Sequence, residues 1–284
     1  MIHSHNESEK NSIPIITIGL PVFNGENSIK ASIESIINQS LQNWELIISD
    51  NNSNDQTVKV IEDIILNDRR IFLYKQKENI GHYANHDFVL KKSKGKYFHW
   101  LAADDTRSTN FLKENVSYLE NNSDYIASCS IKYFGSTKKN QVNNINFKLE
   151  QETPEKRISF LLDNIWHSHA ICWSVVRAEK FKNCQFLDEY YLARDWITNI
   201  FLAMNGKIAL QKNSYIVLGE SGVSKVDPFK SFRVFWIEYF IPLYSCHKRF
   251  NYISRNFNFA VKAQFQIKFI FLHITIIKIN IKMY

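Results

Sequence analysis

Acidic and amide side chains follow three apolar runs of the sequence, at the places where buried strands would end. The apolar runs and the polar segments after them are 15–20 with 21–26, 44–48 with 50–55, and 97–101 with Asp104 and Asp105. Adjacent carboxylates repel each other unless a cation or hydrogen-bond donors compensate. Carboxylate-bound Mg²⁺ or Mn²⁺ commonly bridges to substrate phosphates. These residues therefore predict a nucleotide diphosphate substrate held by Asp50 and the Asp104–Asp105 pair. The alternative is that both aspartates only cap the next helix.

The elements that would position these residues alternate along the first 130 residues. Continuous apolar runs, typical of buried parallel strands, alternate with stretches whose apolar residues recur at helical spacing. The expected strands are 15–20, 44–48, 71–74, 97–101 and 125–134, and the expected helices are 27–40, 55–65, 82–92 and 110–120. This alternation predicts an α/β fold with helices on both faces of a parallel sheet, where ligands bind at the carboxyl ends of the strands. The sequence contains neither GxGxxG nor GxxxxGK[ST], which argues against a dinucleotide fold and a P-loop.

Five segments, in order, resemble family 2 glycosyltransferases. They are PVFNGE, SDNNSNDQT, ENIGHYAN, GKYFHWLAADD and ARDW, and together they cover about residues 14–205. The resemblance implies a GT-A fold, a Rossmann-like and mostly parallel sheet flanked by helices. It also implies an inverting enzyme that uses a nucleotide sugar and usually a divalent metal, here Mn²⁺ or Mg²⁺.

The resemblance also implies roles for individual residues. The implied nucleotide-sugar-binding residues are Pro21, Val22, Asn24, Glu26, Asp50, Asn79, Gly81 and Asp104. Within this set, Asp50 would accept a hydrogen bond from the imide of the base. Asp105 would bind the metal, and Asp195 would deprotonate the acceptor hydroxyl. For the base, Asp188 and Glu189 are nearby alternatives, and Trp196 offers Asp195 a packing anchor.

The sequence departs from the family pattern at three positions. Ala102 stands where the family often has a further acid, and Asn51 replaces the second acid after the second strand. An amide can still hydrogen-bond at that place. Arg194 precedes the proposed base where Glu is common. A guanidinium beside Asp195 would lower its pKa, but neighbours on a helix do not face each other.

His167 and His169 form a second candidate group. They could contact the acceptor or complete the metal shell, although histidines at the surface or in the core are more common. The four cysteines form no CxxC pair, so the sequence predicts neither a disulfide framework nor a zinc site.

We expect three segments in the chain. They are a disordered tail at 1–13, a catalytic domain at 14–224, and a helical, basic and aromatic C-terminal extension at 225–284. The catalytic domain would have a nucleotide-sugar half at about 14–134 and an acceptor half at about 154–224, with a strand expected at 171–176. The N-terminus is polar and does not resemble a secretory signal.

The extension carries the whole positive excess. From residue 225 onward there are ten Lys or Arg and two acids, a net charge of +8, whereas the chain as a whole carries +7. Such asymmetry indicates an anionic partner, and we favour a membrane surface over nucleic acid. Simple packing of the extension against the domain is the alternative. The longest uncharged apolar run, 269–277, has nine residues. About 20 are needed to cross a bilayer, so we expect no span.

The sequence thus predicts transfer of a sugar from a nucleotide-diphosphate donor to a glycan or lipid-linked hydroxyl, in surface polysaccharide biosynthesis. We expect a cytoplasmic protein, peripheral at the inner face of the membrane if the extension binds lipid. One alternative is a catalytically silent nucleotide-sugar-binding module, favoured by Ala102 and Arg194. A nucleotidyltransferase is less favoured because its Gly-rich triphosphate loop is missing.

Overall fold

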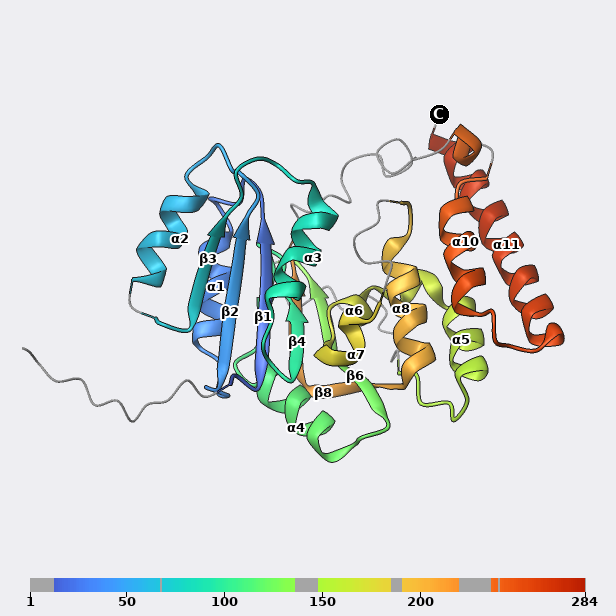
Figure 1. Cartoon of the computed structure of the whole chain (residues 1–284), viewed down its shortest axis with the longest axis horizontal. Helices are drawn as coiled ribbons and strands as arrows, with labels where there is room; N and C mark the ends of the chain where they lie inside the picture. Colours follow the sequence, from blue (N-terminus) through green and yellow to red (C-terminus); the bar gives the residue numbers. More distant parts are fainter. Residues whose placement is uncertain are drawn as a thin grey trace, which may run out of the picture.

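The protein is described by a computed structural model that covers residues 13–66, 68–135, 148–184, 191–219, 236–239 and 241–283. A single sheet of eight strands runs through this part of the chain, in the order β3-β2-β1-β4-β7-β6-β8-β5 (Figure 1). The strands are β1 (Ile16–Val22), β2 (Trp44–Asp50), β3 (Ile71–Lys75), β4 (Tyr97–Trp100), β5 (Thr106–Arg107), β6 (Tyr125–Phe134), β7 (Val175–Arg177) and β8 (Lys207–Leu218). The pairs β1–β2, β1–β4, β2–β3 and β6–β8 are parallel, whereas β4–β7, β6–β7 and β5–β8 are antiparallel.

Helices connect and cover these strands. They are α1 (Ile29–Ile37), α2 (Thr57–Ile65), α3 (His82–Lys92), α4 (Phe111–Asn121), α5 (Pro154–Asp163), α6 (His169–Cys172), α7 (Ala178–Lys182), α8 (Arg194–Asn205), α10 (Tyr244–Ile253) and α11 (Phe259–Met283). Two 3₁₀ turns, η1 (Ile165–His167) and η3 (Trp236–Tyr239), complete the described elements.

The N-terminal half forms as its sequence pattern predicts, and its register brings the polar segments together. Parallel pairing places Val22 at the end of β1 opposite Asp50 at the end of β2. α3 packs directly on β1 and β2. Gly19 makes this approach possible, because a Cβ there would lie 2.7 Å from the Val89 side chain. The polar segments after β1, β2 and β4 therefore lie along one edge of the sheet.

Alternation along the strands divides the core between the two faces of the sheet. On β1 and β2, Ile18 and Ile48 belong to a cluster with α1, α2 and α4. Ile47 belongs to a second cluster with α3, α5, α7 and α8. Burial of apolar side chains on both faces fixes the register, since a one-residue slip would exchange the faces.

The strand expected at 171–176 is wrong in part. Residues 169–172 form the short helix α6, and β7 begins only at Val175. Ile171 and Val175 are both fully buried. A short apolar run of this kind does not distinguish a buried strand from a buried helix.

The C-terminal helices share the core of the second half instead of standing apart from it. In Figure 1, α10 and α11 lie beside α5 and α8, at the end of the molecule away from α2. The α10 residues Cys246 and Phe250 and the α11 residues Phe265 and Phe269 are buried in the cluster that contains α8. The rings of Phe250 and Phe269 stack 4.5 Å apart.

The expectation that nothing in the extension could cross a membrane needs correction. α11 is one continuous helix, and Phe259–Lys278 is long and apolar enough to span a bilayer by length and composition. The lysines within this stretch do not divide it into shorter apolar runs, because lysines can extend their ammonium groups along a helix towards water. In the structure, however, one face of α11 packs against the protein. Length and composition alone therefore do not make this helix a span.

Candidate functional site

The loops after β1 and β2 are tied together by hydrogen bonds. The N–H of Asn24 donates to Oγ of Ser53 (2.9 Å), and the N–H of Asn54 donates to Oδ1 of Asn24 (3.0 Å). The carboxylate of Glu26 accepts the N–H of Gln56 (2.7 Å). The structure thus uses Asn24 and Glu26 to fix the shape of this rim. Their contact with a nucleotide stays a prediction, as does that of Pro21 and Val22 at the end of β1.

Asp50 is the last residue of β2, and only one of its two carboxylate oxygens accepts a hydrogen bond from the described residues. Its side chain is 2% exposed, and Oδ2 accepts the N–H of Ser53 (3.0 Å). Oδ1 is buried and has no hydrogen-bond partner among the described residues. A buried acceptor without a partner costs about 1–3 kcal/mol. A ligand N–H placed at this oxygen would remove that cost.

Asn51, one of the three departures from the family pattern, forms hydrogen bonds with the segment before α3. Its Nδ2 donates to Oδ1 of Asn79 (2.9 Å), and its Oδ1 accepts the N–H of Ile80 (2.9 Å). Oδ1 of Asn79 also accepts the N–H of Gly81 (2.9 Å). Gly81 has a φ of 89°, which glycine adopts without strain. Asn79 and Gly81 therefore sit on the same rim as Asp50, through Asn51.

The two adjacent aspartates after β4 have different surroundings. Asp105 is 3% exposed, and its Oδ1 accepts the N–H of Gly219 (2.9 Å). Its Oδ2 lies 3.4 Å from the guanidinium of Arg107. Burial raises the pKa of Asp105, and the charge of Arg107 opposes that shift. Asp104 is half-buried and packs on Gly219, where a Cβ would lie 2.3 Å from its carboxyl group.

Arg107 and His99 belong to this site but carried no recognisable signal in the sequence. The Arg107 side chain is fully buried, and its Nε donates to Nε2 of His99 (2.9 Å). Burial, and then the charge of Arg107, lower the pKa of His99 well below its usual value. A neutral imidazole can accept this hydrogen bond. Arg107 is thereby held against Asp105 beneath the edge of the sheet.

Asp195 lies in the first turn of α8 and is half-buried. The preceding Ala193 has a φ of 62°, a left-handed conformation that non-glycine residues rarely adopt and that is enriched at functional sites. The Arg194 guanidinium lies 3.9 Å from the centre of the Tyr83 ring on α3. The aromatic ring of Tyr83 is thus a described neighbour of this guanidinium.

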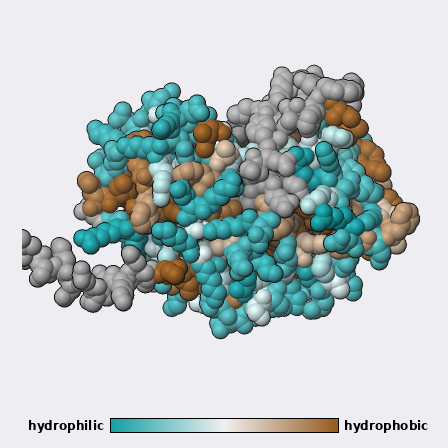
Figure 2. All heavy atoms as spheres, viewed as in Figure 1, coloured by the Kyte–Doolittle hydropathy of each residue, from teal (hydrophilic) through white to brown (hydrophobic). Residues whose placement is uncertain are grey.

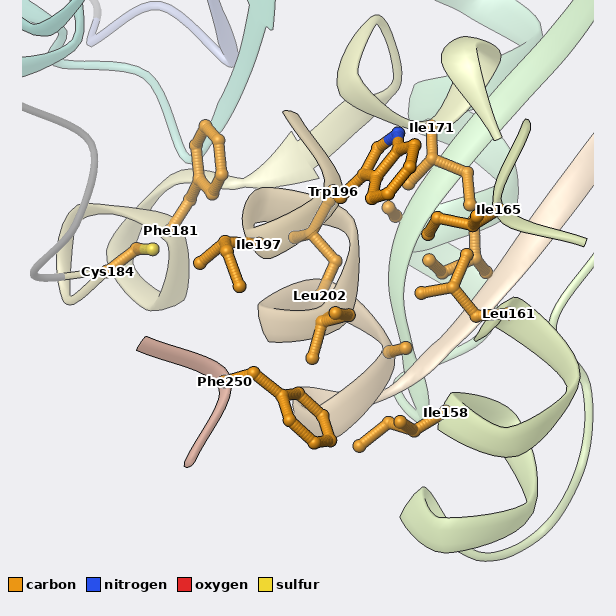
Figure 3. Close-up of a cluster of buried hydrophobic side chains, with 14 of the residues drawn as sticks. Ile158, Leu161, Ile165, Ile171, Phe181, Cys184, Trp196, Ile197, Leu202 and Phe250 are labelled. Atoms are coloured by element: carbon orange, nitrogen blue, oxygen red, sulfur yellow. The ribbon is translucent and has the colours of Figure 1, made fainter. Parts of the chain in front are cut away.

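The helix that carries Asp195 is anchored on several sides. Figure 3 shows Trp196 directed towards Ile165 and Ile171, with Ile197 on the side of Phe181. The ring of Trp196 also meets that of Trp166 edge-on, with centroids 5.0 Å apart. This packing fixes the start of α8, and hence the position of the Asp195 backbone.

The buried Cys172 thiol is influenced by the charges of both Asp105 and Asp195. Burial raises the pKa of Cys172, and the charges of Asp195 and then Asp105 raise it further. The thiol therefore lies within electrostatic reach of both carboxylates, at the end of α6. The predicted base, Asp195, and the predicted metal ligand, Asp105, consequently belong to one region, although they are 90 positions apart in the sequence.

The acceptor contacts expected for His167 and His169 stay a prediction. The side chain of His167 is exposed, and its carbonyl oxygen lies 3.4 Å from Nζ of Lys132. His169 begins α6, and its side chain lies outside the described part of the structure, as do Asp188 and Glu189. Among the described residues, no group of three or more His, Cys, Asp or Glu side chains could hold a metal ion.

Comparison with known proteins identifies similar sequences and folds. The chain is 34% identical over 111 residues to an uncharacterized glycosyltransferase of Haemophilus influenzae, a match that covers 39% of the chain and 44% of the relative. It is 32% identical over 126 residues to the UDP-Glc:alpha-D-GlcNAc-diphosphoundecaprenol beta-1,3-glucosyltransferase WfgD of Escherichia coli, covering 41% and 49%. The matches thus span less than half of the length of these relatives.

Two solved structures share the fold. S. aureus TarS 1–349 in complex with UDP-GlcNAc superposes with a TM-score of 0.60 at 14% identity, covering 89% of the chain and 79% of TarS. The mannosyltransferase PcManGT of Pyrobaculum calidifontis, in complex with GDP-Man and Mn²⁺, gives a TM-score of 0.55 at 15% identity, covering 73% and 57%. At these identities the likeness concerns the fold, and it confirms the predicted GT-A architecture.

Sequence and structure therefore lead to the same assignment. The family model of Glycosyl transferase family 2 matches residues 17–184, which is more than half of the chain. The matched part includes the strand ends that carry Asp50, Asp104 and Asp105. The resemblance noted in the sequence is confirmed, and the chain belongs to glycosyl transferase family 2.

Proposed function

We propose that this chain transfers a sugar from a nucleotide-diphosphate donor to a hydroxyl of a glycan or lipid-linked acceptor in polysaccharide biosynthesis. Family membership supports sugar transfer. TarS is seen with UDP-GlcNAc, and the name of WfgD specifies a diphosphoundecaprenol-linked acceptor. The observation that carries the proposal is the buried, unpartnered Oδ1 of Asp50 at the carboxyl end of β2. The imide N–H of a uracil or similar base would satisfy it.

The proposed reaction is a single displacement at the anomeric carbon. Asp195 takes the proton of the acceptor hydroxyl, whose oxygen attacks the anomeric carbon from the face opposite the diphosphate. The bond from the anomeric carbon to the diphosphate oxygen breaks, and the configuration inverts. A half-buried carboxylate on a firmly packed helix suits a general base, since the base must be held within hydrogen-bond reach.

We propose the aspartate pair as the metal site, with Asp104 in place of the predicted Asp105 as the ligand. Both oxygens of Asp105 already face protein groups, the N–H of Gly219 and the guanidinium of Arg107. Asp104 is the more exposed carboxylate, so it would hold Mn²⁺ or Mg²⁺ together with the donor phosphates. The buried Asp105 would help to keep Asp104 in position. Such ions commonly use one or two carboxylates plus substrate phosphates. When bound, the metal would neutralise charge on the departing diphosphate.

Calorimetric titration with UDP tests the nucleotide site. Asp50→Asn keeps the shape of the side chain but presents an N–H to the base, so we expect UDP binding to weaken by roughly 10- to 100-fold. Asp163→Asn, a surface change on α5, is the control and should bind UDP like the wild type. Equal UDP affinity of Asp50→Asn and wild type would contradict the assignment. UDP binding without turnover of any nucleotide sugar would favour the catalytically silent module.

A membrane surface is the second partner that we propose, and the exposed face of α11 supports it. Ile267, Ile270, Phe271 and Ile274 recur at helical spacing on one side of the helix and are all exposed. Figure 2 shows apolar atoms along the edge of the molecule that α11 forms. The opposite face packs into the core, so α11 would lie in the headgroup region, with the cations of the extension near anionic lipid. We accordingly propose the inner face of the cell membrane as its location.

Sedimentation with vesicles of phosphatidylglycerol and phosphatidylcholine tests this partner. Phe271→Ser and Ile270→Ser should each reduce the bound fraction, because each removes apolar area from the exposed face. Leu66→Ser, at an apolar position that is 81% exposed just after α2, is the control. We also expect release near 1 M salt, where the Debye length falls to about 3 Å. Equal binding by all variants, or binding by none, would leave α11 as a packing helix.

A further inference from the structure

Arg194 is a buried cation to which the described residues supply few of the partners that a buried cation normally has. Its side chain is 5% exposed, and Nη1 has no hydrogen-bond partner among the described residues. Its guanidinium lies 3.9 Å from the centre of the Tyr83 ring. The carboxylate whose charge acts on it is that of Asp87, which is already paired with Lys91 at 2.5 Å. Burial lowers the pKa of Arg194.

The surroundings of this guanidinium add positive potential and a second donor without a partner. Arg194 occupies the first position of α8, and Tyr83 the second position of α3, so two helix N-termini meet here. No side chain caps the start of α3. The hydroxyl of Tyr191 is buried, has no partner in the described part of the chain, and lies within electrostatic reach of Arg194. The adjoining His82 is exposed, so solvent reaches the first turn of α3.

Arg157 shows how this fold treats a buried arginine with a structural role. Its side chain is also 5% exposed, but Nε donates to the carbonyl of Ala203 (2.7 Å). Its Nη1 donates to the carbonyls of Gln151 (2.8 Å) and Glu152 (3.0 Å). An unpaired buried charge is costly, and it is tolerated where a ligand supplies the counter-charge. The contrast indicates that Arg194 is kept for a ligand and not for the fold.

We propose that Arg194, with the hydroxyl of Tyr191 and the N-terminus of α3, binds an oxyanion carried by one of the two substrates. This inference rests on the proposed function, since the anion would belong to the donor or the acceptor of sugar transfer. The oxyanion is either the diphosphate of the donor or a carboxylate on a sugar. Where the family often has an acid before the base, this chain thus has a cation that selects a negatively charged group.

Two matched substitutions, Arg194→Met and Arg157→Met, separate a binding role from a structural one. Arg157→Met should lower the midpoint of thermal unfolding, because it leaves three carbonyl groups without donors. Arg194→Met should leave that midpoint unchanged or raise it, because it removes a buried charge that no carboxylate of the described residues pairs with directly. Loss of stability by Arg194→Met equal to that of Arg157→Met would overturn the proposal. Arg194→Lys keeps the charge and provides a second folded variant for the binding measurements.

Calorimetry with uridine, UDP, inorganic diphosphate and glucuronate distinguishes the sources of the oxyanion. If the donor supplies it, Arg194→Met weakens UDP and diphosphate binding by roughly 10- to 100-fold and leaves uridine unchanged, with Arg194→Lys in between. If a sugar carboxylate supplies it, Arg194→Met loses only glucuronate binding, measured in the presence of UDP. Unchanged binding of all probes overturns this inference alone. Failure of the wild type to bind UDP overturns the proposed function as well.

Discussion

Replacing Asp105 by asparagine should destabilise the fold as well as affect the site. The Arg107 side chain is fully buried, and its guanidinium faces the Asp105 carboxylate at 3.4 Å. An asparagine could still accept the N–H of Gly219, so the main loss is the counter-charge of Arg107. Removing one member of a buried ion pair costs about 3–5 kcal/mol. The 3.4 Å separation between Asp105 and Arg107 is long for a hydrogen bond, and His99 still accepts from Arg107. We therefore expect the free energy of unfolding to fall by about 3 kcal/mol, the lower end of this range.

Urea titration of five proteins measures this effect: the wild type, Asp104→Asn, Asp105→Asn, Arg107→Met and the double variant. Asp104→Asn is the matched control, and because Asp104 is half-buried and outside the pair it should change the free energy of unfolding by less than about 1 kcal/mol. The double variant Asp105→Asn with Arg107→Met removes the orphaned cation, so it should lose less than the sum of the two single losses. Wild-type stability of Asp105→Asn, or strict additivity of the two changes, would refute the buried-pair argument.

Two further predictions concern the C-terminal helices. Phe269→Ala should cost about 3–5 kcal/mol in urea titration because the ring is fully buried against Phe250, whereas Phe271→Ala, at a position 65% exposed, should cost no more than about 0.5 kcal/mol. Equal losses would show that α11 is not part of the core. His273 has its pKa lowered to about 4 by burial and by the charge of His247, from an ordinary 6.5. The unfolded chain therefore takes up this proton first, so the contribution of His273 to stability is complete above pH 6.5 and is lost as the pH drops towards 4. His273→Phe should flatten that acid limb, and an unaltered pH profile of unfolding would contradict the argument.

The N-terminal half of the fold could be predicted closely because its signals are local. The helix 82–92 and the strand 125–134 have the bounds that periodicity indicates. Asp50 and Asp104 are expected along one edge of the sheet because ligands bind at the carboxyl ends of parallel strands. These inferences need only spacing along the chain.

The surroundings of the acidic residues could not be predicted, since they depend on contacts between distant positions. Nothing in the sequence shows that Arg107 faces Asp105 or that Gly219 donates to it, because that contact joins residues 114 positions apart. The left-handed Ala193 before α8 is set by tertiary packing. The sequence identified both members of the aspartate pair, but only the structure distinguishes the buried one from the more exposed one.

The extension illustrates a different limit of the sequence. Its charges suggested a surface segment, yet Nζ of Lys268 binds Asp163 on α5 at 2.6 Å, and the Phe269 beside it is buried. A net charge counts cations without showing which of them pair within the fold. Predicting the packing of α11 would have required knowing which face of the helix meets α10.

The central claim is that Asp195 is the general base of sugar transfer, and turnover by Asp195→Asn tests it most directly. The measurement compares wild type, Asp195→Asn and Asp163→Asn for transfer from a panel of UDP- and GDP-sugars to a diphosphoundecaprenol-linked GlcNAc acceptor, together with the affinity for UDP. We predict that Asp195→Asn lowers the catalytic rate by roughly 10²–10⁴-fold and leaves UDP affinity nearly unchanged, because the amide keeps the shape but cannot take the proton. Near-wild-type turnover by Asp195→Asn would contradict the role of Asp195, and no turnover of any donor by the wild type would contradict the proposed function.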